Sequence, residues 1–293
     1  MKAGKGDTKD MRDRSGKQAV LKRQLDWARR TGKRFDSRGY LDSVDANLFQ
    51  PLSAVALGHL QAGSGSELAD TPGRPAKMKA LHSSAALAAN VFDYWTARNT
   101  APLMLALGVP DAGQEGVVHA IGFEQQYPTG LGGNPPNLDV TLASGPDFTV
   151  AVERKFTEWM TPKPVRTDSF RPAYFPDTGP LWSSRGLHGC QRLAEAIAKG
   201  EEHFRWLDAP QLLKHALGLA TAIRGRFSLH YLYFDCTGEA GSAHRAEILR
   251  FASMVGEETG FMSRSYQDLF DRISTHACGQ ARDYLAYMKD RYF

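Results

Sequence analysis

The chain has 293 residues, of which 42% are hydrophobic and 23% charged, which excludes an intrinsically disordered chain and supplies enough apolar side chains for a substantial core. No run approaches the roughly 20 consecutive apolar residues that cross a bilayer, and the region after Met1 lacks the apolar stretch of a signal peptide, so we expect a cytoplasmic protein with no membrane partner. The three cysteines are widely spaced, which argues against a disulfide framework, and the net charge of +4 is unevenly distributed.

The basic character of the chain is concentrated at its N-terminal end. Residues 1–38 carry 13 Lys and Arg against 5 Asp, a net charge of +8, and residues 39–293 carry −4. The first 16 residues are almost free of apolar side chains, so we expect them to be mobile, whereas KQAVLKRQLDWARR (17–30) has the spacing of a short amphipathic helix. This basic arm either gathers phosphates of a nucleic acid or is a solvated face.

Short strands are predicted in the middle of the chain, after an apolar segment at 48–60 and a core helix that begins near Ser83. The strand-like pieces are 117–127, 137–143 and 147–156, and the connections GLGGNPPN and SGP carry loop and turn signals. Three consecutive strands with short connections predict an antiparallel meander.

The second half of the chain alternates between helix and strand. Residues 161–180 contain five prolines and predict an insertion or surface loop that closes over another part of the molecule. Helices follow up to residue 223, the second of them capped by Asp208, and then a buried strand at 227–236 and amphipathic helices with a break near Gly260. We therefore expect one α/β domain at 39–293, with a mixed sheet flanked by helices.

Charged side chains near the ends of two predicted strands suggest a metal site. Alternation places Glu153 and Lys155 on the same face of one strand, and Asp139 lies on the preceding strand. The two carboxylates could hold Mg²⁺, or Mn²⁺ in its place, with the backbone carbonyl of Arg154 as a further ligand. Lys155 could then orient or help to deprotonate a metal-bound water, or offset charge on a phosphate, as phosphodiester hydrolysis requires.

A third acid on the first strand of the meander could complete this site. Glu124 could reach the same metal or a second one, and Gln125 or Gln126 would take its place if the register differed by one residue. The alternative is that Glu153 and Lys155 form an exposed cross-strand pair, since E-x-K alone occurs by chance in many proteins. The presence of Asp139 on the neighbouring strand favours the metal site.

Other polar residues have both a functional and a structural interpretation. Gln211 and Lys214 share one face of the helix after the Asp208 cap, where they could touch a phosphate or a water, or simply decorate the helix. Glu158 is expected at the surface. The nine histidines show no metal-binding spacing and are interpreted as packing or surface residues.

These motifs resemble a known group of enzymes. PNLDV and AVERKF are similar to the D…E-x-K signature of the PD-(D/E)XK nuclease superfamily, with its restriction-endonuclease-like fold, and the resemblance covers about residues 80–275. FEQQYPTGLGGNPPNLDV, ERKFTE and DAPQLLKHALGL resemble a bacterial subgroup of restriction endonucleases or related nucleases. The chain departs from the pattern in having Pro136 three residues before Asp139.

The resemblance implies a role for each residue of the cluster. Asp139 and Glu153 would bind metal, Lys155 would be the catalytic lysine, and Glu124 would be an auxiliary acid. We therefore expect a Mg²⁺-dependent endonuclease that acts on DNA, possible as a homodimer. The alternatives are a repair, recombination or RNA-directed nuclease with the same site, and a nucleic-acid-binding protein that keeps the fold without catalysis.

Overall fold

A computed structural model of the chain describes residues 15–63, 66–109, 119–133, 135–144, 148–277, 279 and 281–293. Mobility was predicted for residues 1–16: residues 1–14 lie outside the described residues, and Ser15 and Gly16 are instead the first residues of α2. The first two residues of the strand predicted at 117–127 and the first residue of the strand predicted at 147–156 also lie outside the described residues. The α-helices are α2 Ser15–Arg30, α3 Ala54–Ala62, α4 Ser84–Phe92, α5 Ala101–Leu107, α6 His188–Lys199, α7 Ala209–Ala222, α8 Glu239–Thr259, α9 Tyr266–His276 and α10 Arg282–Arg291. The short 3₁₀ helices are η1 Asp45–Asn47, η2 Lys77–Lys79, η3 Asp93–Trp95, η4 Glu158–Met160, η5 Pro172–Tyr174 and η6 Ser183–Arg185.

A five-stranded mixed sheet forms the centre of the molecule, with its strands in the order β1-β2-β3-β4-β5. The strands are β1 His119–Gln126, β2 Asn137–Ser144, β3 Phe148–Lys155, β4 Arg226–Tyr233 and β5 Met262–Ser265. The first three pair antiparallel, and β3, β4 and β5 run parallel. The predicted α/β class, with a meander followed by helices and another strand, is confirmed.

Strand β5 was not predicted. The sequence indicated helix on both sides of a break near Gly260, and the break is present, with Gly260 in the left-handed region at φ +54°. The four residues after Phe261, MSRS, contain a single apolar side chain, so no hydrophobic alternation marks them as a strand. Pairing with β4 at the edge of the sheet supplies the backbone hydrogen bonds that make them one.

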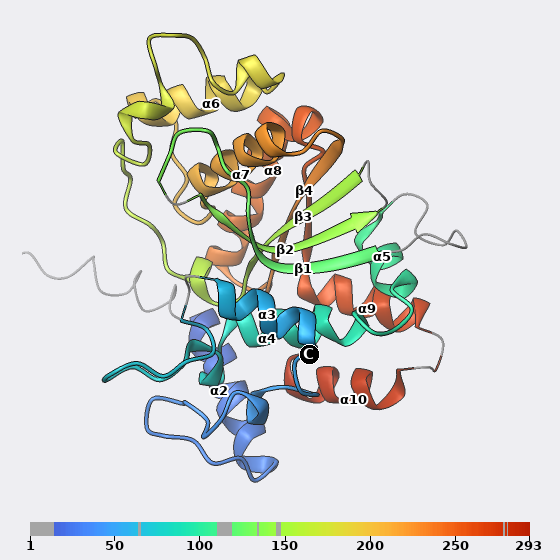
Figure 1. Ribbon diagram of the computed structural model, residues 1–293. Helices are drawn as coiled ribbons and strands as arrows, with labels where there is room; N and C mark the ends of the chain where they lie inside the picture. Colours follow the sequence, from blue (N-terminus) through green and yellow to red (C-terminus); the bar gives the residue numbers. More distant parts are fainter. Residues whose placement is uncertain are drawn as a thin grey trace, which may run out of the picture.

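Helices cover both faces of the sheet and give three layers (Figure 1). Helices α6, α7 and α8 lie on one face, and α4, α5 and α9 lie on the other, while α3 packs beside β1. Residues that are paired in register share a face, so Val140 and Val152 point away from α7, and Ala151 and Glu153 point toward it. The polar side chains at the end of β3 are therefore divided between the two layers.

Helix α7 approaches the sheet closely. Gly218 makes this possible, because a Cβ at this position would lie 2.4 Å from the carbonyl oxygen of Tyr127, which follows β1. The predicted cap is present: the side chain of Asp208 accepts a hydrogen bond from the backbone N–H of Gln211 at 3.2 Å. The cap and the close approach fix the position of the first turns of α7 beside the end of β3.

The N-terminal helix α2 is part of the packed body. Trp27 and Ala28 are buried, and the guanidinium of the fully buried Arg291 donates to the side chain of Gln24 at 3.1 Å. Arg291 also lies over the Trp27 ring, 4.2 Å from its centroid. Within the part of the chain that the structure describes, no helix is long and apolar enough to cross a membrane.

A buried histidine of α8 packs near the ends of β3 and β4. The ring of His244, on α8, stacks on Trp159 with centroids 3.9 Å apart, and its Nε2 lies 3.0 Å from the hydroxyl of Tyr231. Burial lowers the pKa of His244 to about 3, so the folded state holds this ring neutral. Folding is therefore linked to proton binding at this position.

We expect the free energy of unfolding to fall as the pH drops from 6.5 toward 3, because unfolded His244 binds a proton that the folded protein excludes. The contribution is about 1.4 kcal/mol per pH unit within this window and is fully present above pH 6.5. Urea unfolding at a series of pH values would show a shallower slope in His244→Gln. The exposed His203→Gln serves as the control, and an unchanged slope in His244→Gln would contradict the linkage.

Candidate functional site

The candidate site lies where β2 and β3 stop pairing. The backbone pairing of these strands runs as far as Val140 and Val152, and the next contact between them is made by the side chain of Asp139. Oδ2 of Asp139 accepts a hydrogen bond from the backbone N–H of Arg154 at 2.8 Å. The carboxylate thus satisfies a main-chain donor of β3 and is held against that strand.

Glu153 and Lys155 lie on the α7 side of β3, as alternation predicted. The ammonium of Lys155 donates to Oε1 of Glu153 and, at 3.1 Å, to the side-chain oxygen of Gln211. Nε2 of His215 lies 3.0 Å from Oε2 of Glu153, and the side chains of both residues are only 1% exposed. Two residues of α7, four positions apart, therefore hold the two charged residues of the E-x-K motif.

His215 was missed by sequence reasoning, which interpreted the histidines as packing or surface residues. For His215 this interpretation is incomplete, since its ring is buried against the carboxylate of Glu153. One signal was present: Gln211 was already a candidate, and His215 follows it by one helical turn on the same face. The distance to β3 depends on tertiary packing and could not be read from the sequence.

Glu124 occupies a strained position at the end of β1. Its φ is +49°, in the left-handed region that only two of the described non-glycine residues adopt. A conformation of this kind costs on the order of 1–3 kcal/mol and persists where the surroundings enforce it. Its Oε2 lies 3.4 Å from the side-chain nitrogen of Asn137, and its Oε1 lies 3.4 Å from the guanidinium of Arg154.

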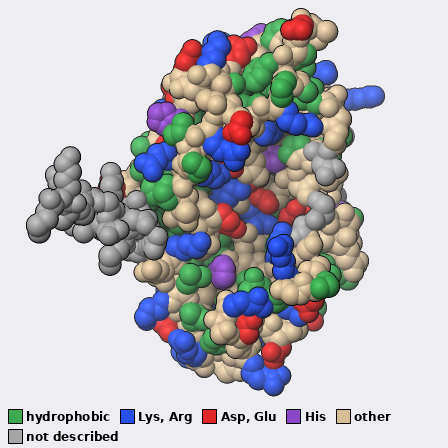
Figure 2. Space-filling view, turned by 90° about the vertical axis from the view of Figure 1, so that its left-hand side faces the viewer, with side chains coloured by type: hydrophobic (Ala, Val, Ile, Leu, Met, Phe, Trp, Pro, Cys, Tyr) green, Lys and Arg blue, Asp and Glu red, His purple; other side chains and the backbone are tan. Residues whose placement is uncertain are grey.

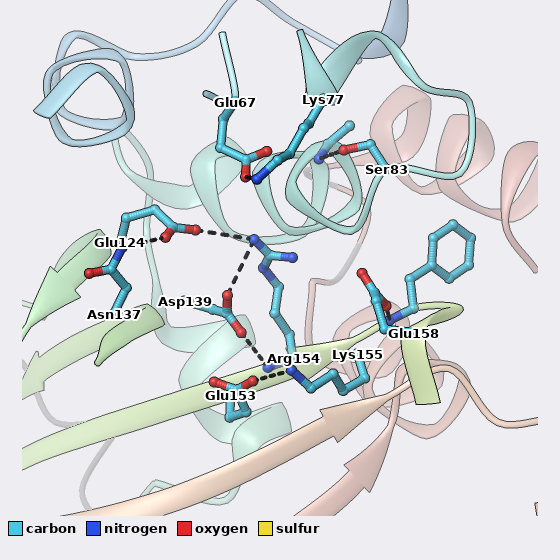
Figure 3. Close-up of polar contacts among 12 residues, drawn as sticks. Glu67, Lys77, Ser83, Glu124, Asn137, Asp139, Glu153, Arg154, Lys155 and Glu158 are labelled. Atoms are coloured by element: carbon cyan, nitrogen blue, oxygen red, sulfur yellow. Dashed lines mark hydrogen bonds and ion pairs between the residues drawn. The ribbon is translucent and has the colours of Figure 1, made fainter. Parts of the chain in front are cut away.

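The guanidinium of Arg154 lies between two acids (Figure 3). One of its terminal nitrogens is 3.4 Å from Glu124 and 3.5 Å from Oδ1 of Asp139, and the side chain is only 5% exposed. From the sequence, only the backbone carbonyl of this residue was expected to take part in the site. Its side chain belongs to the opposite face from Glu153, so its approach to Asp139 was not anticipated.

Burial and pairing shift the acid pKa values in opposite directions. Burial raises the pKa of Asp139, an effect that Arg154 opposes and the charge on Glu153 reinforces. Burial also raises the pKa of Glu124. For Glu153, burial is outweighed by the ammonium of Lys155 and by His215, so its pKa is lowered. The carboxylate of Glu153 in turn raises the pKa of Lys155 despite burial, which keeps the ammonium charged.

Other candidates lie outside this cluster. Lys214 donates to the carbonyl oxygen of Ser169 at 2.7 Å and lies over the ring of Phe170, so it fastens α7 to the proline-rich segment 161–180. Gln126 donates to the side chain of Asn137 at 2.9 Å, and Gln125 donates to a main-chain oxygen of its own strand. Glu158 is exposed, as predicted.

The proline-rich segment contacts the loop before β2. The guanidinium of Arg171 donates to the carbonyl oxygen of Gly132 at 3.3 Å, and Phe170 and Tyr174 pack against the buried Trp182. This segment therefore closes over the glycine-rich loop that leads into the strand of Asp139. Its aromatic residues give it a packed position despite the absence of long regular structure.

The donor set is compatible with a hard divalent ion. Asp139 and Glu153 offer oxygen ligands, and Oε2 of Glu153 is buried and accepts no well-directed hydrogen bond even though the His215 ring is close, so a cation would satisfy this atom. Within the described ranges, no group of three or more His, Cys, Asp or Glu is arranged to hold a metal ion. An ion at this position would have Asp139 and Glu153 as its protein ligands and would take its other ligands from water, which Mg²⁺ tolerates.

Acidic and basic side chains meet in a hollow on one face of the molecule, and further Lys and Arg side chains surround it (Figure 2). This mixture differs from a uniformly basic patch. A face of this kind combines groups able to bind a cation with groups able to contact phosphate.

The sheet, its helical layers and the charged strand ends are consistent with a restriction-endonuclease-like core. A family model described as "Restriction Endonuclease associating with ARP" matches residues 23–293, so the chain belongs to this family. No curated protein and no solved structure shows significant similarity to the chain.

The coupling energy between Lys155 and Glu153 can be measured without an activity assay. We expect Lys155→Met to lower the free energy of unfolding by about 3 kcal/mol, because it leaves the Glu153 carboxylate buried without its ammonium partner. The same substitution in a Glu153→Gln background should cost clearly less. Urea unfolding of the wild type, both single variants and the double variant gives the coupling energy.

The exposed pair Lys22 and Asp26, whose side chains are 79% and 43% exposed, is the matched control. Its double-mutant cycle should give a coupling below about 0.5 kcal/mol. Additive effects at Lys155 and Glu153 would show that the buried contact is not a stabilising pair.

Proposed function

We propose that this protein is a metal-dependent endonuclease that hydrolyses DNA phosphodiester bonds, of the PD-(D/E)XK type. The observation that carries the proposal is that Asp139 on β2 accepts a hydrogen bond from the backbone of β3 between Glu153 and Lys155, which are themselves paired. The membership of a restriction-endonuclease family supports it. The same three side chains are those that the D…E-x-K resemblance identifies.

Asp139 and Glu153 would hold Mg²⁺, or Mn²⁺ as a substitute. When bound, the ion supplies Lewis-acid chemistry: it lowers the pKa of a coordinated water and neutralises charge on the phosphate. Glu153 enters this role already ionised, because Lys155 and His215 lower its pKa. Asp139 is kept in place by its hydrogen bond from the Arg154 backbone.

Lys155 would act as a cation. Its ammonium is held between Glu153 and Gln211, and its raised pKa keeps it protonated at neutral pH. An ammonium in this position donates hydrogen bonds and offsets the charge that develops on the scissile phosphate, and it can orient a water. This favours charge stabilisation over the alternative in which Lys155 removes a proton from the water.

A non-catalytic role in nucleic-acid binding is the second candidate. The position of Arg154 favours it, because a guanidinium already lies against two of the three acids. A repair, recombination or RNA-directed nuclease would use the same residues. The nucleic acid that the protein cleaves would distinguish these alternatives from a restriction endonuclease. We further propose that the protein acts together with an ARP partner, as the family description indicates, and a homodimer remains a prediction.

Cleavage should depend on Glu153 and Lys155 and on a divalent ion. We expect Glu153→Ala and Lys155→Ala to reduce Mg²⁺- or Mn²⁺-dependent cleavage of plasmid DNA by at least about 100-fold, since each removes charge stabilisation from the reacting centre. DNA binding should remain within a few-fold of wild type. Gel-based cleavage and fluorescence anisotropy measure the two quantities, and chelation of the metal should abolish only the first.

Glu257→Ala and Lys199→Ala are matched controls, because both residues are exposed and belong to other elements. They should cleave as the wild type does. Binding of DNA with no cleavage by the wild type under any divalent metal would reject the nuclease and support the non-catalytic candidate.

The basic N-terminal region should contribute to binding through phosphate contacts. Because α2 is packed into the body, the variant leaves α2 intact and changes basic residues that precede it in the sequence. Replacing Lys2, Lys5, Lys9, Arg12 and Arg14 by Gln should lower the slope of log K against log salt by roughly 0.9 for each phosphate that the variant no longer neutralises. Replacing Arg192 and Lys199 on α6 is the comparison, and an unchanged slope in the arm variant would reject a role of the arm in phosphate binding.

A further inference from the structure

One cation of the protein itself already lies within the acidic cluster. The Arg154 guanidinium is within 3.5 Å of carboxylate oxygens of both Glu124 and Asp139. Its main-chain N–H donates to the other oxygen of Asp139 at 2.8 Å, so one residue contacts both oxygens of that carboxylate. This leaves the region between Glu124 and Asp139 filled by a charged group.

The surroundings of Glu124 hold its carboxylate toward this guanidinium. The left-handed backbone at Glu124 interrupts the regular course of β1, and Asn137 contacts the second carboxylate oxygen at 3.4 Å. The side chains of Glu124 and Arg154 are 11% and 5% exposed. A buried Arg154 guanidinium without these acids would have no opposite charge to offset its loss of hydration. Moving it away from Glu124 and Asp139 is therefore unfavourable.

The charges of the cluster favour a single added ion. Three carboxylates, from Glu124, Asp139 and Glu153, face two cations, Arg154 and Lys155, so the ionised cluster carries a net charge of −1. One divalent ion changes this to +1, which matches the single negative charge of a phosphodiester. Two ions would leave +3 in a largely buried site, which is electrostatically unfavourable.

We propose that Arg154 is a built-in cation that fills the position between Glu124 and Asp139, so that the site accepts one divalent ion, held by Asp139 and Glu153. This rests on the metal site of the proposed function and makes it more specific. Glu124 then serves as the anchor of Arg154 and is not a metal ligand. Arg154 determines both how many divalent ions bind and how tightly the single ion binds, because its positive charge repels a nearby cation.

The experiment measures Mn²⁺ binding by the full chain in the absence of nucleic acid, by calorimetry and by electron paramagnetic resonance. We expect the wild type to bind one ion, and Arg154→Met to bind the first ion at least tenfold more tightly and to gain a second. Adding Glu124→Gln to Arg154→Met should remove the second ion. Arg154→Lys, which keeps the charge, should bind one ion.

Glu124→Gln alone is the second test, which does not depend on the folding of Arg154→Met. It should keep the single ion and bind it less tightly by no more than tenfold, because the substitution removes one negative charge from the cluster but removes no ligand of the ion. A loss of more than tenfold, or equal affinity and stoichiometry in the wild type and Arg154→Met, would overturn this inference while leaving the nuclease intact. Absence of Mn²⁺ binding in every variant would overturn the metal site itself, and with it both proposals.

Discussion

Charges removed from water at the ends of β1, β2 and β3 govern the arrangement of this site. A buried carboxylate or ammonium is tolerated only when it is paired and hydrogen-bonded. Glu153 meets this condition through the ammonium of Lys155, with the His215 ring beside its second oxygen, and Asp139 and Glu124 meet it through Arg154. The positions of these side chains follow from the need to pair each buried charge.

The mixed topology of the sheet brings these partners together. The antiparallel half supplies the acids, because a meander places β1, β2 and β3 side by side. The parallel half requires a crossover from β3 to β4, and α7 in this crossover brings Gln211 and His215 to the end of β3. Strand β3 belongs to both halves, which explains why the E-x-K motif lies on it.

The arrangement divides the functions of the two cations. Lys155 lies on the α7 side, bound to the acid of its own motif, whereas Arg154 lies against the acids contributed by the neighbouring strands. Adjacent residues of a strand point to opposite faces, so one short motif supplies a cation to each group of acids. A residue that a sequence motif treats as variable thus becomes part of the charge balance of the site.

The features with a local signal could be predicted from the sequence alone. Alternation in residues 147–156 placed Glu153 and Lys155 on one face, turn residues defined the meander, and Asp208 marked the start of α7. The contacts of His215 with Glu153 and of Arg154 with Glu124 arise only in the folded chain, as does the strand formed by residues 262–265. These features depend on pairing between segments far apart in the chain, and local periodicity carries no information about such distances.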